Sequence, residues 1–265
     1  MCPALYRLFT PLMLLLLSSV PTHSIQFSDI HGHASAGVTH QYARFEQPCM
    51  PREVGFMAGP TVDLLAHYCW FSAYAGFRGL WDVAHITARN GLFVDARELQ
   101  ANLHLGYRWT SECKQFTVTP FTGIDYIQLN HMLETSACAV MIGHQYKQIN
   151  VPLGITCEHT FCDTFNWGIK AYYDIDVWNR LALCTPDVHT PEQRCIKLKR
   201  GDRVYIETPV NWHCAITDCI QAECTLAPLF SWQRFGAAEC APEDVVIPKR
   251  TIWHVGALMS FGVRF

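Results

Sequence analysis

The sequence predicts an all-β protein that folds as a closed antiparallel up-and-down transmembrane β-barrel, with eight strands. Three observations support this fold class. One stretch alternates apolar and polar residues without an exception, every second residue at the end of the chain is apolar, and long and short connections alternate between the candidate strands. A barrel of ten or twelve strands is the alternative, if residues 30–60 add a hairpin.

The clearest strand signal lies in residues 97–109. Its two alternating sets are Leu99, Ala101, Leu103, Leu105, Tyr107 and Trp109 against Glu98, Gln100, Asn102, His104, Gly106 and Arg108. Successive side chains of a β-strand point to opposite faces, so this stretch has one apolar face and one polar face. A helix would scatter the same residues around its axis, and we therefore predict a strand.

The terminal stretch, residues 252–265, repeats this pattern. Every second residue back from the end is apolar: Phe265, Val263, Phe261, Met259, Ala257, Val255 and Trp253. A soluble sandwich strand shows such a face over five or six residues, whereas a membrane-crossing strand needs about nine to eleven. The length of this apolar face favours a membrane.

Six further stretches show the same period, and they complete the eight strands. They are 61–77, 118–126, 149–157, 165–177, 204–216 and 220–232. The connections alternate in length, with short turns at 110–116, 160–164 and 217–219 and long loops at 78–96, 131–146, 179–202 and 233–251. Barrels of the outer membrane have short periplasmic turns and longer outer loops, so this order indicates the same topology.

The beginning of the chain predicts export. Residues 1–24 carry Arg7, a short apolar run at 12–17 and small residues at 22–24, which is the pattern of a signal peptide. We expect residues 25–60 to form a periplasmic N-terminal segment and residues 61–265 to form the barrel. The net charge of −3 argues against nucleic acid as a partner.

The end of the chain resembles the C-terminal signature of bacterial outer-membrane β-barrel proteins. The matching positions are Phe265, Val263, Phe261 and Met259. The resemblance implies a place in the bacterial outer membrane, contact with its lipid, and recognition of this assembly signal by the barrel-assembly machinery.

The polar faces define a predicted lumen with charged residues of both signs. We expect a lumen charge network that contains Glu98, Arg108, Lys170, Asp174, Glu207 and Arg264. Unpaired charges in a narrow lumen are costly, so these groups should form ion pairs and hydrogen bonds. A barrel of eight strands is filled by its own side chains, and we expect no wide pore.

Thirteen cysteines are present, and twelve remain after Cys2 leaves with the signal peptide. Their spacing is poor for zinc, whereas an oxidising compartment favours disulfides. Cys184 and Cys195 share one outer loop and form a candidate disulfide. Cys113, Cys162 and Cys219 lie one in each periplasmic turn and are candidate intermolecular thiols.

The number of cysteines and the Arg-Phe ending are similar to the disulfide-cross-linked envelope proteins of chlamydia-like bacteria. This resemblance implies that other envelope proteins are partners through disulfides.

Four functions are consistent with the sequence. The first is an integral outer-membrane barrel with a structural or surface-exposed role, no cofactor and no enzymatic activity. The second is a narrow porin or transport channel. The third is a lipid-acting enzyme, for which Ser260 and His254 lie too far apart along one strand to touch. The fourth is a soluble secreted disulfide-rich β-protein, with a lipocalin-like barrel whose apolar face points inward.

Overall fold

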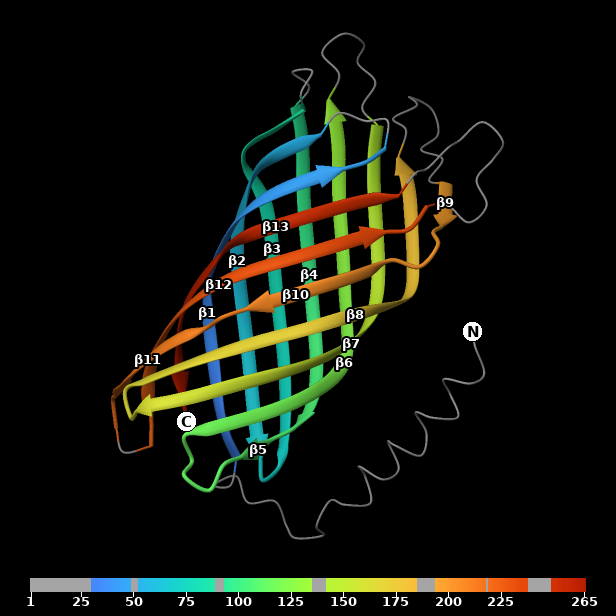
Figure 1. The fold of residues 1–265 in the computed structure, drawn as a ribbon. Coiled ribbons are helices and arrows are strands. Elements are labelled where there is room, and N and C mark those ends of the chain that lie inside the picture. The colour runs from blue at the N-terminus through green and yellow to red at the C-terminus, as the bar shows by residue number, and fades with distance from the viewer. Residues whose placement is uncertain are drawn as a thin grey trace, which may run out of the picture. The chain divides into compact units, whose positions relative to one another are not determined.

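The computed structural model describes residues 30–48, 52–88, 93–134, 142–184, 194–217, 219–237 and 249–265 (Figure 1). The predicted signal peptide, residues 1–24, lies outside the described residues. Within the described ranges, no helix is long and apolar enough to cross a membrane.

All the regular elements of the described chain are β-strands. They are β1 (Ile30–Glu46), β2 (Glu53–Tyr68), β3 (Phe71–Ala88), β4 (Phe93–Tyr107), β5 (Trp109–Thr110), β6 (Phe116–Glu134), β7 (Ile142–Cys162), β8 (Phe165–Cys184), β9 (Arg194–Lys197), β10 (Asp202–Glu207), β11 (Val210–Ala215), β12 (Gln221–Phe235) and β13 (Arg250–Arg264).

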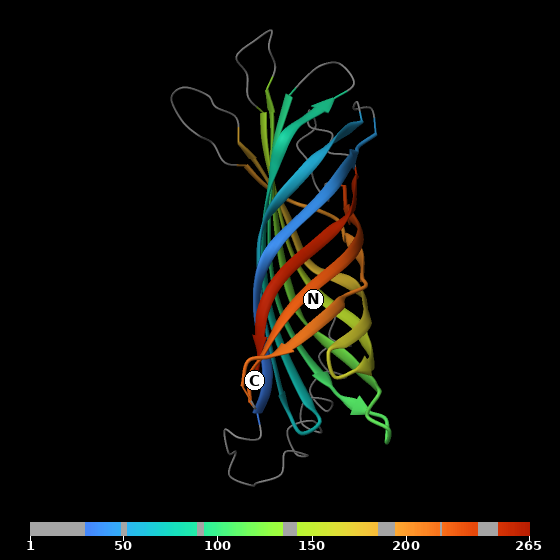
Figure 2. The same cartoon turned by 90° about the vertical axis from the view of Figure 1, so that its left-hand side faces the viewer.

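These strands form one closed antiparallel sheet, which Figure 2 shows from the side. β13 pairs with both β12 and β1, and this pairing closes the barrel. β10 and β11 pair with the same two neighbours, β8 and β12, so together they occupy one strand position. β5 continues the β4 edge along β6, and β9 pairs with the end of β8. The barrel therefore has ten strand positions.

The predicted number of eight strands is wrong, and the ten-strand alternative is correct. β1 and the start of β2 lie in the range 25–60 that we expected to be a periplasmic segment, so the barrel begins at Ile30 rather than at residue 61. β3 occupies residues that we divided between a strand at 61–77 and a loop at 78–96. The β2–β3 turn has Cys69 at a φ of 51°, and it carries no glycine or proline that would mark a turn.

The two ends of the barrel differ in their connections. One end has the short connections 69–70, 163–164 and 216–220, and there His33 of β1 pairs with Arg264 of β13 (Figure 1). We call this the turn end. The opposite end, which has Glu46, Glu53 and Arg250, is the loop end.

Candidate functional site

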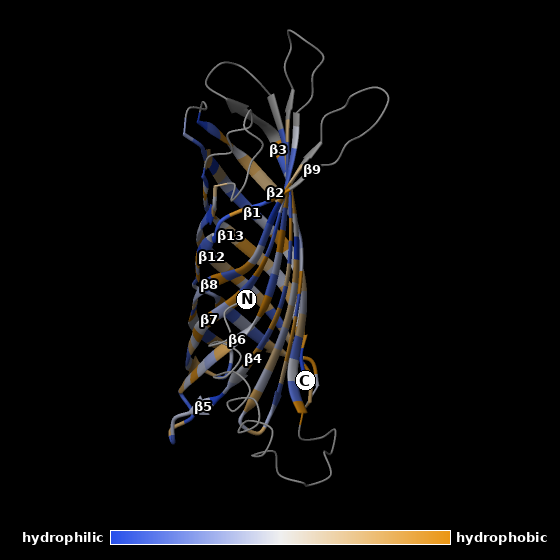
Figure 3. Cartoon of the chain, turned by 90° about the vertical axis from the view of Figure 1, so that its right-hand side faces the viewer, coloured by the Kyte–Doolittle hydropathy of each residue, from blue (hydrophilic) through white to orange (hydrophobic). Residues whose placement is uncertain are grey.

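The outer face of the barrel is apolar from the turn end to beyond its middle. Leu103 of β4 is 53% exposed and Phe261 of β13 is 59% exposed, whereas Ser260 points inward and is buried. Hydrophilic and hydrophobic residues alternate along the strands (Figure 3). The soluble lipocalin-like alternative is wrong, because it requires Leu103 and its neighbours to lie inside.

In lipid, a sheet satisfies its backbone hydrogen bonds only when it closes on itself, and here a closed sheet presents an apolar outer face. The chain is a transmembrane β-barrel of the outer-membrane type. This fold agrees with the location in the outer membrane that the terminal strand predicts.

Toward the loop end, the barrel inverts its pattern. Charged pairs appear on the outer face: Arg44 with Glu46, Arg97 with Asp95, and Arg234 with Asp202. We call these six residues the exterior charge ring. At the same level and beyond it, apolar side chains fill the inside: Ala43, Phe45, Met57, Leu80, Ala96, Leu129, Tyr146, Leu181, Leu198, Phe235 and Ile252. Charges outside and apolar side chains inside are typical of a sheet in water, so we infer that the edge of the lipid lies near this ring.

The middle of the lumen is closed by a buried polar cluster. Arg203 is 1% exposed, donates to Gln100 Oε1 at 3.0 Å, and lies 3.6 Å from Asp174 Oδ2. His104 Nε2 lies 2.6 Å from Asp125 Oδ1. We call these residues the polar plug. Charged groups of both signs and their hydrogen-bond partners meet here, which limits the cost of burying them.

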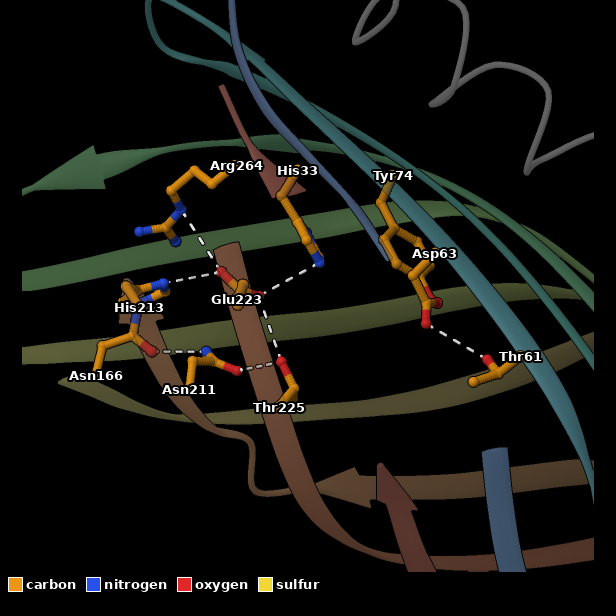
Figure 4. Close-up of polar contacts among 10 residues, drawn as sticks. All are labelled: His33, Thr61, Asp63, Tyr74, Asn166, Asn211, His213, Glu223, Thr225 and Arg264. Carbon is orange, nitrogen blue, oxygen red and sulfur yellow. Dashed lines mark hydrogen bonds and ion pairs between the residues drawn. The ribbon is translucent and has the colours of Figure 1, made fainter. Parts of the chain in front are cut away.

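Below the polar plug, toward the turn end, the lumen contains a cavity of about 150 Å³. Its mouth is built around Glu223, which faces His33 at 3.4 Å, His213 at 3.2 Å and Arg264 at 3.7 Å (Figure 4). Three basic side chains from three strand positions thus surround one buried carboxylate.

A second polar group lines the wall of this turn-end cavity. Asn211 Nδ2 donates to Asn166 Oδ1 at 2.6 Å, and Thr225 Oγ1 donates to Asn211 Oδ1 at 2.7 Å (Figure 4). These hydrogen bonds link β8, β11 and β12. They connect these strands near residues 208–209, where the chain passes from β10 to β11.

In the structure, the predicted lumen charges lie in different parts of the barrel and make separate contacts. Asp174 belongs to the polar plug and Arg264 to the mouth of the turn-end cavity, while Lys170 and Glu207 line its wall. Glu98 is buried and accepts a hydrogen bond from Gln100. Arg108 follows β4 at the turn end, where its backbone N–H donates to Trp70 O at 2.6 Å. Periodicity found the inward faces, but it gives no information on which strands face each other across the lumen.

A third polar cluster lies at the loop end, beyond the exterior charge ring. Glu53 lies 2.6 Å from His131 Nε2 and 3.2 Å from Arg250, next to His144. Burial, followed by the charge of Arg250, lowers the pKa of His131 to about 4, and the same two causes lower that of His144 to about 4. Burial raises the pKa of Glu53, but the hydrogen bond and charge of His131 outweigh it and lower the pKa overall. Sequence reasoning missed this cluster, because His131, His144 and Arg250 lie in stretches that we expected to be loops and Glu53 lies in the expected periplasmic segment.

The predicted thiols are at the turn end. Cys113, Cys162 and Cys219 are exposed and free. Hydrogen bonds from Ser111 and Thr164 lower the pKa of the Cys113 and Cys162 thiols, respectively.

The other cysteines add no disulfide to the described part of the chain, where Cys69, Cys157, Cys214 and Cys224 are also free. Cys184 ends β8 and Cys195 lies in β9, opposite Ala182. Their side chains are outside the described residues, so this disulfide stays a prediction.

The residues of the predicted assembly signal share the outer face of β13. Phe265, Val263, Phe261 and Met259 are all exposed apolar side chains. The backbone of Phe265 also pairs with that of Gly32, through hydrogen bonds of 2.8 and 2.9 Å. The last strand thus closes the barrel and presents these apolar side chains outward.

One arrangement resembles a nucleophile with its base. Ser231 Oγ lies 3.1 Å from His254 Nδ1, and His254 Nε2 lies 3.7 Å from Glu98. All three residues are buried, and neither the turn-end cavity nor the smaller one beside it is lined by them. Neither of these two cavities therefore gives a substrate access to Ser231. Within the described ranges, no group of three His, Cys, Asp or Glu residues is arranged to hold a metal ion.

Neither a protein-family model nor a curated protein matches the chain. Among solved structures, it is similar to the outer-membrane protease OmpT from Escherichia coli, with a TM-score of 0.48 and 10% identity over 92% of this chain and 99% of that one. It is also similar to the translocator domain of the autotransporter NalP from Neisseria meningitidis, with a TM-score of 0.46 and 11% identity over 99% and 97% of the chains. At these values, neither structure assigns a functional residue to the chain.

Proposed function

We propose that the protein is a closed, non-conducting barrel of the outer membrane with a structural or surface-exposed role and no enzymatic activity. The filled lumen is the observation that carries this proposal. Arg203 and its partners fill the middle of the lumen, and the apolar cluster around Phe45 and Met57 fills the loop end.

A narrow porin is the competing function, and the two closures argue against it. Ion conduction needs a continuous path of water or polar groups. At the loop end, an ion would have to pass Phe45, Leu129 and Phe235, which are fully or almost fully buried, and a cation would also meet the charge of Arg250, whose guanidinium group lies 5.0 Å from the centre of the Phe45 ring. The turn-end cavity therefore ends inside the barrel and is not the entrance of a channel.

Conductance in planar lipid bilayers tests the absence of a pore. The barrel is purified in detergent, and its folded state is checked by the shift in gel migration on boiling. We expect no reproducible conductance step from the folded protein. A step of constant size that is present in the folded sample and absent from the boiled one would establish a channel and overturn the proposal.

Epitope insertion tests the surface-exposed role. A short epitope placed after Gly236, at the loop end, should bind its antibody on intact cells. The matched epitope after Lys114, at the turn end, should bind only after the outer membrane is opened. The reverse result would show that the loop end faces the periplasm.

Disulfide linkage to neighbouring envelope proteins is the second candidate function. The exposed thiols of Cys113, Cys162 and Cys219 at the turn end support it, and the lowered pKa of the first two favours their reactive thiolate forms.

Non-reducing gels of intact envelopes test this linkage. Oligomeric bands should disappear on reduction and in the triple variant Cys113→Ser, Cys162→Ser and Cys219→Ser. The control variant Cys224→Ser, on the wall of the barrel, should keep them. If the unsubstituted protein runs only as a monomer, the linkage does not exist.

A further inference from the structure

The outer face of the barrel carries a group of cations on β7, β8 and β9, toward the loop end. We call this group the outer basic patch, and its residues are Lys147, Arg180, Lys197, Lys199 and Arg200. We propose that the patch binds the phosphate groups of lipid headgroups in the leaflet that surrounds the loop end. This site goes beyond the structural or surface-exposed role proposed above, and it does not depend on that role.

The register of the strands places three of these cations in one row. Lys147 of β7 pairs with Arg180 of β8, and Arg180 pairs in turn with Lys197 of β9. The row lies on the outer face, because the residues next to it in the chain are buried inside the barrel: Tyr146, Leu181 and Ile196. Like charges directly opposite each other on neighbouring strands repel, so an anion bound to this row would stabilise it.

The segment that follows β9 adds two more cations. The backbone N–H of Leu198 donates to Asn179 O at 3.2 Å, so the chain continues along β8 beyond the last paired residue of β9. Lys199 and Arg200 come next, and both are exposed. Residues 197–200 therefore lie beside β8 and enlarge the positive charge of the row.

The acids nearby do not balance this charge. Among the described residues, no carboxylate lies at ion-pair distance from Lys147 or Arg180. Asp176 of β8 points into the barrel and is buried. Asp202 begins β10 on the outer face, but it is already paired with Arg234 at 2.6 Å. The described part of the patch therefore has an excess of positive charge.

The position of the patch favours lipid as the partner. The outer face is apolar on the side toward the turn end, with Ile149 two residues from Lys147 on β7 and Val177, which is 59% exposed, three residues from Arg180 on β8. The guanidinium group of Arg180 lies 5.3 Å from the centre of the Trp178 ring. Tryptophan and basic side chains at the end of an apolar face are typical of the headgroup level, where lipid phosphates lie.

Native mass spectrometry of the full barrel in a neutral detergent tests the site. The barrel is incubated with an equimolar mixture of phosphatidic acid and diacylglycerol that carry the same acyl chains, so the two lipids differ only in the phosphate group. We expect phosphatidic acid to bind at least about ten-fold more tightly, because several basic groups act on one phosphate. Equal binding of the two lipids would mean that only the apolar face holds lipid, and would overturn the proposal.

Inorganic phosphate separates a lipid site from a site for a free anion. Added at the concentration of the phosphatidic acid, it should not displace the lipid, because free phosphate makes no contact with the apolar outer face. Displacement at this concentration would assign the patch to a soluble anion and would overturn the assignment to lipid.

Three variants, each checked for folding by its gel shift on boiling, locate the effect. Lys147→Gln and Arg180→Gln should each weaken the binding of phosphatidic acid about five-fold, because each removes one basic group at the headgroup level. Arg97→Gln is the matched control: it removes the same charge from the outer face, but at a position where Asp95 already pairs with the cation, and it should keep full binding. An equal loss in all three variants would mean that net charge alone attracts the lipid, and full binding in both patch variants would place the lipid elsewhere. Either result would overturn the proposal.

Discussion

At the scale of single residues, Arg203 is the central side chain of the polar plug that closes the lumen. Among the described residues, it is the largest side chain that the barrel encloses almost completely. Its guanidinium group lies over the rings of Tyr172 at 5.7 Å and Tyr205 at 5.2 Å, and it contacts Gln100 and Asp174. A guanidinium group stacks on aromatic faces while its edges form ion pairs, so one residue of β10 joins its neighbours on β10 and β8 to Gln100 of β4 across the lumen.

Replacing Arg203 should therefore destabilise the barrel strongly. Arg203→Met keeps much of the volume but leaves Asp174 without its cation, at a cost of about 3–5 kcal/mol. Urea unfolding followed by tryptophan fluorescence measures this change. Arg97→Met, in the exposed pair with Asp95, is the control and should have little effect. Equal stability of the two variants would mean that the polar plug does not hold the strands together.

The loop-end cluster predicts that acid weakens the barrel. The pKa of His131 and that of His144 lie near 4 in the folded state, below the usual 6.5, so the unfolded chain binds protons first as pH falls. The contribution of these two histidines to the free energy of unfolding should be constant above about pH 6.5 and fall between about 6.5 and 4. Unfolding midpoints at a series of pH values measure the slope.

Glutamine variants assign this slope to the two histidines. The double variant His131→Gln and His144→Gln should show a much flatter profile between about pH 6.5 and 4. His31→Gln, at the exposed start of β1, should leave the profile unchanged. If the double variant keeps the full slope, other groups cause it.

At the scale of strands, the sheet needs glycine where neighbouring backbones come closest. A Cβ at Gly123 of β6 would overlap Leu103 O and would lie 2.8 Å from His104 Cα, both in β4. Gly123→Ala should therefore destabilise the barrel by about 1–3 kcal/mol, measured by urea unfolding. Gly79→Ala is the matched control, because its nearest contact is the exposed Trp81 ring at 3.2 Å, which can move. A stable Gly123→Ala barrel would show that β4 and β6 can separate without cost.

The last strand carries the prediction on assembly. If Phe265 is the assembly signal, Phe265→Ala should lower the amount of folded barrel in the outer membrane several-fold. The measurement is the ratio of the folded to the unfolded band in membranes. Leu103→Ala, another exposed apolar residue on the lipid face, should assemble normally. Equal loss in both variants would point to lost apolar surface and not to a signal.

The strands that cross lipid could be predicted, because lipid outside and polar groups inside give strict alternation. Residues 97–109 and 252–265 show it, and both form strands. β1 was missed because small and polar residues, such as Ala34, Ala36 and His40, occupy its outer face. β3 was missed because its turn has no glycine or proline to mark it.

The cavity could not be predicted for a different reason. Alternation placed Lys170 on the inner face, but its contact with Tyr74 depends on which strands face each other across the barrel. That geometry depends on the number of strands and on their stagger. With eight strands, other strands would face Lys170 across the lumen than in the barrel of ten strands.

At the scale of the whole molecule, the barrel consists of two levels that face different solvents. Below the exterior charge ring, the outer face is apolar and the lumen is polar. Above it, the outer face carries charges such as Asp95 and Arg97, and the inside is mainly apolar, packed around the buried cluster of Glu53, His131 and Arg250. The same closed sheet thus continues from lipid into water by exchanging the roles of its two faces. The loop-end level is packed like the core of a soluble β-protein, which explains how it closes the lumen without a separate plug domain.

This two-level arrangement predicts where solvent reaches the outer face. Asp95 and Leu103 lie on the same face of β4, eight residues or about 26 Å apart. In a background with the native cysteines replaced by serine, Asp95→Cys should react on intact cells with a maleimide that cannot cross membranes. Leu103→Cys should react only after the lipid is removed with detergent, because lipid covers its side chain. Protection of both positions would place the charge ring inside the membrane, and reaction of both would mean that the apolar face does not contact lipid.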